Sequence, residues 1–155
     1  MIVVSIIAIL ALIALPNFSD KYVREQIIDS VKLADIAKAP IALQWARSGT
    51  MPTDNGAAGL PPAVMVVNNN ISSVAVESGA IHITFGNHAH SAIQGKTLTL
   101  RPAVIDGSPI VPIAWICGFS EPPGNMSAKG INKTNIKVGY LPLNCRSTRP
   151  SSSSS

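Results

Sequence analysis

The first sixteen residues form an almost uninterrupted apolar run, in which Ser5 is the only polar side chain before Pro16. A helix of this length would extend for about 24 Å, a little short of the roughly 30 Å hydrocarbon core of a membrane. Because the segment is apolar on every side, such a helix must be buried in lipid, in a protein core or among copies of itself. The pattern therefore predicts a helix over residues 1–16 that avoids water.

A cleaved secretory signal is one interpretation of this run, and a simple membrane anchor is another. A signal normally has basic residues before its apolar part and small residues at a cleavage site after it. No basic segment precedes this run, and Leu15-Pro16-Asn17-Phe18 leads directly into a helical pattern. These flanks argue against a cleaved signal, whereas the membrane anchor remains an alternative to a helix packed among its own copies.

Residues 17–48 continue the helical pattern in amphipathic form. Apolar side chains recur three, four and seven residues apart, which places one face of the helix against a core. This face contains Val23, Ile27, Val31, Ala34, Ile41 and Trp45. A second, weaker stripe of Leu33, Ile36 and Leu43 indicates contact with a neighbouring molecule. The polar side includes two pairs with the spacing of helix ion pairs, Asp20 with Arg24 and Asp29 with Lys32.

Two prolines interrupt the helical region. Pro16 and Pro40 each lack a backbone N–H and crowd the carbonyl four residues earlier, which predicts two kinks or one break. The helical signal ends near Gly49 and is soon followed by Pro52. Residues 49–62 are rich in Gly, Pro and Ala, so they are predicted to form a connecting loop.

A series of short β-strands is predicted across residues 63–117. Runs rich in β-branched residues, separated by turn residues, occur at 63–67, 71–77, 80–85, 96–104 and 113–117. Their short connections favour antiparallel pairing. Ile81, Ile83 and Phe85 alternate with His82 and Thr84, which predicts one buried face and one wetter face.

The expected fold is α+β. A long N-terminal helix, apolar in its first half, is the available cover for the buried face of a four- to five-stranded antiparallel sheet. The two cysteines, Cys117 and Cys145, lack the spacing of a zinc or Cys-x-x-Cys site, so a single disulfide is their simplest use. It would bound a C-terminal loop over 118–146 and imply an oxidising compartment. Residues 147–155 form a serine-rich tail that is predicted to be disordered or modified.

Composition favours association and gives no support for specific nucleic-acid recognition. Hydrophobic residues make up 46% of the 155 residues and charged residues only 13%, against about 25% in typical soluble domains. The net charge of +4 comes from scattered residues without a Lys/Arg run. Specific recognition of nucleic acid is therefore not expected, while nonspecific attraction to DNA remains open.

Three histidines, His82, His88 and His90, are the candidate metal ligands, because imidazole suits zinc and copper. No cysteine or acidic residue lies near them in the sequence to complete a four-coordinate site, so no metal and no cofactor is expected. The sequence has neither a Gly-x-Ser-x-Gly elbow nor a phosphate-binding glycine loop, so no enzymatic activity is expected. A membrane-anchored binding module that uses these histidines is the competing hypothesis.

Several motifs together carry a family resemblance. They are the apolar run from Met1 to Pro16, the stretch 95–103, Trp115-Ile116-Cys117-Gly118, and Leu141-Pro142-Leu143-Asn144-Cys145-Arg146. The chain resembles a type IV pilin, the major subunit of bacterial type IV pili. The N-terminal part alone is also similar to minor pilins and type II secretion pseudopilins, which remain alternatives. The cysteine motifs favour a pilin.

The resemblance implies a structural subunit that polymerises into a helical filament on the bacterial surface, after residing in the inner membrane. An assembly platform and motors would be its partners, and host or abiotic surfaces would be its targets. Surface attachment, twitching motility and DNA uptake are the implied roles. The side chains expected in the filament core are Ile2, Val3, Val4, Ile6, Ile7, Ile9, Leu10, Leu12, Ile13 and Leu15.

Two further implications concern the ends of the chain. Some pilins carry O-linked sugar on a C-terminal serine, and the candidates here are Ser151, Ser152, Ser153, Ser154 and Ser155. Pilins of this class are also cut by a prepilin peptidase after a glycine, which leaves an N-methylated phenylalanine and, a few residues later, a glutamate that aids docking. The printed sequence begins after these positions. On this resemblance, the chain is either truncated or misassigned at its start.

Overall fold

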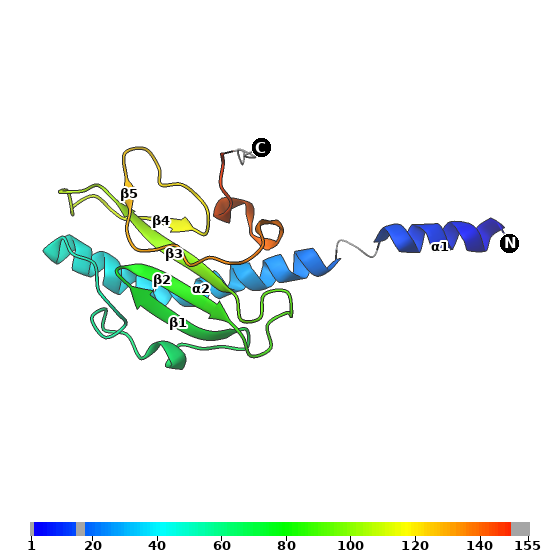
Figure 1. Ribbon diagram of the computed structural model, residues 1–155, viewed down its shortest axis with the longest axis horizontal. Helices are drawn as coiled ribbons and strands as arrows, with labels where there is room; N and C mark the ends of the chain where they lie inside the picture. Colours follow the sequence, from blue (N-terminus) through cyan, green and yellow to red (C-terminus); the bar gives the residue numbers. More distant parts are fainter. Residues whose placement is uncertain (1, 15–17, 150–155) are drawn as a thin grey trace, which may run out of the picture.

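The computed structural model describes residues 2–14 and 18–149, and these residues contain two α-helices, three short 3₁₀ helices and an antiparallel sheet. The apolar helix α1 (Ile2–Ala14) lies apart from the sheet, whereas the long helix α2 (Phe18–Ser48) runs along one face of it (Figure 1). The expected α+β fold is therefore confirmed.

Helix α2 packs on the sheet through the face that the periodicity predicts. Val23, Ile27, Ala34, Ile41 and Trp45 are buried, and Val31 is half-buried. The second stripe is more open, since Ile36 and Leu43 are exposed and Leu33 is half-buried.

The helix continues through Pro40, so the alternative of a break at this proline is wrong. Proline removes one helical hydrogen bond, but Ala37 and Ile41 on either side of it are fully buried in the core. This packing explains why the helix tolerates the proline. Pro16 lies outside the described residues.

The sheet has the order β1-β2-β3-β4, and all of its pairs are antiparallel. Its main strands are β1 (Ile71–Glu77), β2 (Ala80–Phe85), β3 (Thr97–Val104) and β4 (Ala114–Cys117). The register places Ile81 opposite both Val76 and Leu100, so apolar side chains from three strands share one face. This face and α2 enclose the core.

Two details of the sheet differ from the prediction. Residues 63–67 do not form a strand, and Ala63–Met65 is instead a short 3₁₀ helix, η1, in which Val64 and Met65 are exposed. Pro61 and Pro62 directly precede it, and neither can donate to a strand ladder. The loop after β4 also contributes a two-residue strand, β5 (Ser127–Ala128), which pairs with β3.

The outer face of the sheet is drier than its alternating sequence predicts. His82 was expected on the wetter face, yet its exposed fraction is only 5%, and that of Thr99, which lies opposite it on β3, is 0%. The reason is that the loop after Cys117 crosses this face, where the Lys133 N–H donates to the Thr99 hydroxyl at 3.0 Å. The disulfide-bounded loop is therefore a layer of the fold and not only an appendage to its edge.

Candidate assembly surface and disulfide loop

Helix α1 presents apolar side chains that nothing in the described structure covers. Between 52% and 79% of each remains exposed for Ile2, Val3, Val4, Ile6, Ile7, Ile9 and Leu10. Burial of apolar surface is favourable by about 25 cal/mol per Å², so this surface strongly favours a partner or an apolar environment. No helix in the described part of the chain is both long enough and apolar enough to cross a membrane.

Large side chains are also exposed in the first turns of α2, namely Phe18 and Tyr22. His90 from the β2–β3 loop meets Tyr22 edge to face, with ring centroids 6.3 Å apart. The backbone N–H of His90 also donates to the buried Gln26 side chain at 3.0 Å. These contacts connect the beginning of α2 to the sheet domain.

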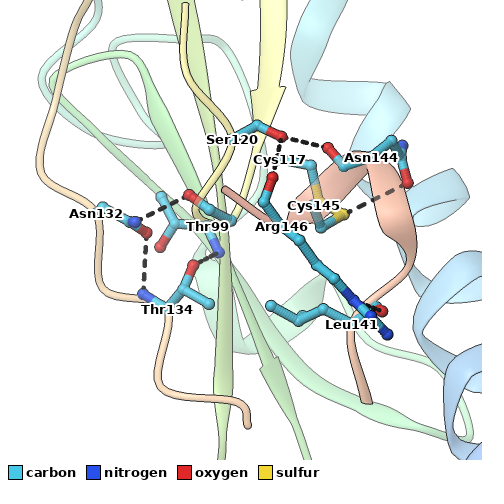
Figure 2. The surroundings of a disulfide bond; sticks show 10 residues. Thr99, Cys117, Ser120, Asn132, Thr134, Leu141, Asn144, Cys145 and Arg146 are labelled. Atoms are coloured by element: carbon cyan, nitrogen blue, oxygen red, sulfur yellow. Dashed lines mark hydrogen bonds between the residues drawn. A yellow bond between two sulfur atoms is a disulfide. The ribbon is translucent and has the colours of Figure 1, made fainter. Parts of the chain in front are cut away.

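The predicted disulfide is present between Cys117 at the end of β4 and Cys145, whose Cα atoms are 4.5 Å apart. Both cysteines are buried. Next to them, the Phe119 N–H donates to the Cys145 carbonyl at 2.9 Å, and Ser120 contacts the Asn144 carbonyl (Figure 2). The two ends of the loop are therefore joined by covalent and hydrogen bonds.

Gly118 allows this close approach. Its φ of +55° lies in the left-handed region, and a Cβ atom here would be 2.7 Å from the Cys145 carbonyl oxygen. A larger residue would strain the backbone and displace the second cysteine. The glycine of the Trp-x-Cys-Gly motif thus has a physical role beside the disulfide.

Polar side chains of the loop after Cys117 form hydrogen bonds with the part of β3 that β4 does not reach. The Thr97 and Thr99 N–H groups donate to the side chains of Asn135 and Thr134, at 2.7 and 3.0 Å. The Asn132 side chain donates to the Gly118 carbonyl at 2.9 Å. These side chains satisfy strand groups that β4 does not reach, so the loop is held along its length as well as at the disulfide.

An ion pair between the loop and β1 lies next to His82. Lys133 from the loop contacts the Glu77 carboxylate, and the Nε2 atom of His82 lies 3.7 Å from the same oxygen. Hydrogen bonding from Lys133 lowers the pKa of Glu77. Burial lowers the pKa of His82, and the charge of Lys133 acts in the same direction. Both effects favour the neutral imidazole, whose Nδ1 atom lies 2.9 Å from the Thr99 hydroxyl.

The loop after α2 covers the opposite edge of the sheet, along β1. The Asn55 side chain accepts from the Val76 N–H at 2.6 Å and donates to the carbonyls of Val74 and Pro61 at 3.0 and 2.9 Å. It therefore occupies backbone groups along the outer edge of β1. Covering an edge in this way prevents uncontrolled strand pairing.

Comparison with known proteins gives the family. The model of the pilin family, described as a bacterial filament protein, matches residues 23–146. The chain belongs to the pilin family. It is 31% identical to the type IV major pilin protein PilE1 of Neisseria gonorrhoeae, over 94% of this chain and 82% of the relative. It is 35% identical to the fimbrial protein EcpC of Eikenella corrodens, over 94% and 85%.

The candidate histidines of this pilin are not brought together. His82 is buried on the sheet, His88 is exposed in the β2–β3 loop, and the Nδ1 atom of His90 accepts from the Ala92 N–H at 3.1 Å. Among the described residues, no group of three or more His, Cys, Asp or Glu side chains could hold a metal ion.

Some predicted site residues of this pilin cannot be placed. Leu15, Pro16 and the serines 151–155 lie outside the described residues, and the side chains of Leu12 and Ile13 are not described either. Their roles in the filament core, the helix kink and glycosylation remain predictions.

Sequence reasoning missed the residues that hold this pilin's loops in place. Asn55, Gln26 and Asn132 are polar residues that each have at least one partner between 14 and 64 positions away in the sequence. Local pattern carries no signal for such pairs. The polar loop composition, rich in Asn and Thr, was the one available hint.

Proposed function

We propose that this chain is a structural subunit that polymerises into a type IV pilus filament. In the filament, α1 helices from many copies form the core, and the sheet domains form the outer shell. The observation that carries the proposal is the apolar surface of α1, which is exposed on every side in a chain of the pilin family. The same surface on each copy allows contacts that repeat without closing into a ring, and such contacts make a filament.

The proposal also states where the subunit resides before assembly. A helix that is apolar except for Ser5 is stable in lipid and equally stable among copies of itself, so the subunit resides in the inner membrane until it is assembled. A membrane platform and motors would move it between these environments. The support is the apolar run itself and the names of the relatives, which are major pilins and fimbrial proteins.

We also propose specific roles for the filament, which would extend from the cell surface and retract. Attachment to host or abiotic surfaces, twitching motility and DNA uptake are the roles we propose. The exposed sheet domain and its disulfide loop would make the outer contacts. The net charge of +4 supports a weak nonspecific attraction to DNA.

Electron microscopy of sheared cell-surface material tests the proposal. Cells that carry the assembly machinery and express this chain should yield thin filaments composed of it. Ile6→Lys places a charge on α1 and should abolish filaments, because an unpaired buried charge is very costly. Ile110→Lys is the matched control, since Ile110 is 91% exposed in the loop between β3 and β4.

Deletion of residues 1–16 separates this proposal from a binding module. The remaining domain should stay folded and form no fibres, whereas a binding module would keep its activity. The proposal is wrong if the full chain never appears in filaments and remains as monomers in the membrane.

A further inference from the structure

Two arginine side chains converge on one backbone carbonyl at the beginning of α2. Arg24 donates from its Nη2 atom to the Gly139 oxygen at 3.1 Å, and Arg146 donates from its Nη2 atom to the same oxygen at 3.2 Å. Two donors that share one acceptor lie within about 6 Å of each other. The structure therefore holds two positive charges side by side where α2 contacts η2 (Val138–Tyr140).

The fold fixes both guanidinium groups in this arrangement. Arg146 follows Cys145 directly, and its Nε atom donates to the Leu141 carbonyl at 2.9 Å (Figure 2). Arg24 comes from a helix that is anchored in the core by its neighbour Val23. The disulfide and the helix thus bring together two charges that are 122 residues apart in sequence. Gly139 itself is exposed, so an ion from solution can reach the pair.

No acidic side chain of the described residues balances this pair. Of the eight acidic residues, five form ion pairs, and all five are with other basic side chains. Asp20 has the spacing to pair with Arg24, but it forms no ion pair in the described structure, so this predicted pair is wrong. The Nε atom of Arg24 is also buried without a hydrogen-bond partner. The Nη1 atom of neither arginine forms a hydrogen bond with a described residue, so both guanidinium groups have donors left for an anion.

We propose that Arg24 and Arg146 bind a phosphate oxyanion, supplied by a phospholipid headgroup. A guanidinium group is a planar fork that binds carboxylate or phosphate through two parallel hydrogen bonds. A carboxylate has two oxygens in one plane, which a single fork occupies. A phosphate presents its oxygens in a tetrahedral arrangement and can accept from two forks that approach from different elements.

The position of the pair favours a headgroup as the source, and this step rests on the proposed membrane-held form of the subunit. Arg24 is six residues after Phe18, the first residue of α2, or about 9 Å along a helix. The headgroup layer on each side of a membrane is about 5 to 8 Å thick. Lys21, one turn before Arg24, adds another cation next to the apolar segment. Basic residues at such a boundary are attracted to anionic lipids.

Side-chain NMR of the two arginines in the full chain tests the site. The protein is prepared in phosphatidylcholine bicelles at about 150 mM salt, close to physiological ionic strength. One arm titrates inorganic phosphate, and the other replaces part of the lipid with phosphatidylglycerol. Both arms should shift the Nε–Hε resonances of Arg24 and Arg146 in a saturable way.

Four variants give the comparison. Arg24→Gln and Arg146→Gln should each weaken phosphate binding by about tenfold, as expected for the loss of one charge-assisted hydrogen bond. Arg24→Lys keeps the positive charge but lacks the planar guanidinium fork. Its affinity for phosphate should lie between that of the two glutamine variants and that of the wild type. Arg47→Gln removes the same charge at the far end of α2 and should bind as the wild type does. The backbone spectrum of each variant shows whether it is folded.

The outcomes separate the possible sources. Shifts in both arms support a headgroup site, and shifts with inorganic phosphate alone support an oxyanion site but overturn the headgroup as its source. Equal binding of acetate overturns the preference for phosphate. No saturable shift in either arm, or equal weakening by Arg47→Gln, overturns the site altogether. A DNA duplex that shifts the two resonances when phosphatidylglycerol does not would assign the phosphate to nucleic acid and overturn the headgroup.

The inorganic phosphate arm depends on neither membrane residence nor filament assembly. A chain that binds phosphate through both arginines but never forms filaments would contradict the proposed function and leave the site intact. A chain that forms filaments and binds no phosphate would overturn the phosphate site and leave the proposed function intact.

Discussion

The imidazole Nδ1 atom of His82 lies 2.9 Å from the Thr99 hydroxyl, and the two residues are directly opposite each other on β2 and β3. The Nε2 atom of the same ring is buried and has no hydrogen-bond partner among the described residues. The C-terminal loop covers both residues, because the Lys133 N–H donates to the Thr99 hydroxyl. A titratable side chain is thus enclosed between the sheet and the loop.

Acidification should therefore destabilise the sheet domain. Burial lowers the pKa of His82 below the usual value of 6.5, so the unfolded chain takes up the proton more readily than the folded one. The stability that neutral His82 contributes is complete above pH 6.5 and declines as the pH falls toward the folded-state pKa. Unfolding measured by circular dichroism between pH 7.5 and 5 checks this.

Two histidine variants isolate the effect. His82→Gln should flatten the pH dependence in this range, although the protein should be less stable at pH 7.5. His88→Gln changes an exposed histidine and should leave the pH dependence as it is in the wild type. If both variants keep the full dependence, another group is responsible.

The disulfide should contribute about 3.6 kcal/mol to the free energy of unfolding, from the chain-entropy model for cysteines 28 positions apart. The double variant Cys117→Ser, Cys145→Ser should lose an amount of this order in denaturant unfolding. Mass spectrometry of the wild type without reductant should find no free thiol. Unchanged stability of the double variant would show that the hydrogen bonds of the loop suffice to hold it.

Asn55→Ala should destabilise the fold by about 2 to 6 kcal/mol. It leaves the buried Val76 N–H and Val74 carbonyl without their partner, and each unsatisfied buried group costs about 1 to 3 kcal/mol. Asn69→Ala is the matched control, because Asn69 is exposed and a surface change of this kind stays within about 0.5 kcal/mol. Similar effects of the two changes would contradict the edge-covering role of Asn55.

Gly130→Ala and Gly107→Ala separate backbone strain from steric contact. Both glycines have φ near +77°, at +78° and +76°, so alanine should cost about 1 kcal/mol at either position. At Gly130 the new Cβ atom would also be 2.5 Å from the Ala80 Cβ, whereas at Gly107 the space is open. The melting temperature of Gly130→Ala should therefore be clearly lower than that of Gly107→Ala. Equal melting temperatures would mean that the loop shifts away from β2 without cost.

The sequence by itself determined the features that depend on local periodicity. The apolar segment before Pro16 and the amphipathic face from Val23 to Trp45 are properties of spacing along a helix, and both were predicted. The strands 71–77 and 80–85 also have the predicted bounds, because alternation and turn residues are local signals as well. Two cysteines allow only one intrachain pair, so the disulfide was predicted too.

The tertiary structure alone decided what covers each surface. His82 and Thr99 alternate with buried residues, which is the pattern of solvent-exposed positions. They are buried only because a loop more than 30 residues away in sequence passes over them. Arg24 has Asp20 at ion-pair spacing, yet it donates to Gly139, 115 positions distant. Residues 63–67 have the composition of a strand, but they follow Pro61 and Pro62 while the Asn55 side chain occupies the edge of β1. Such outcomes depend on competition between segments far apart in sequence, and local pattern carries no record of which partner is closer in space.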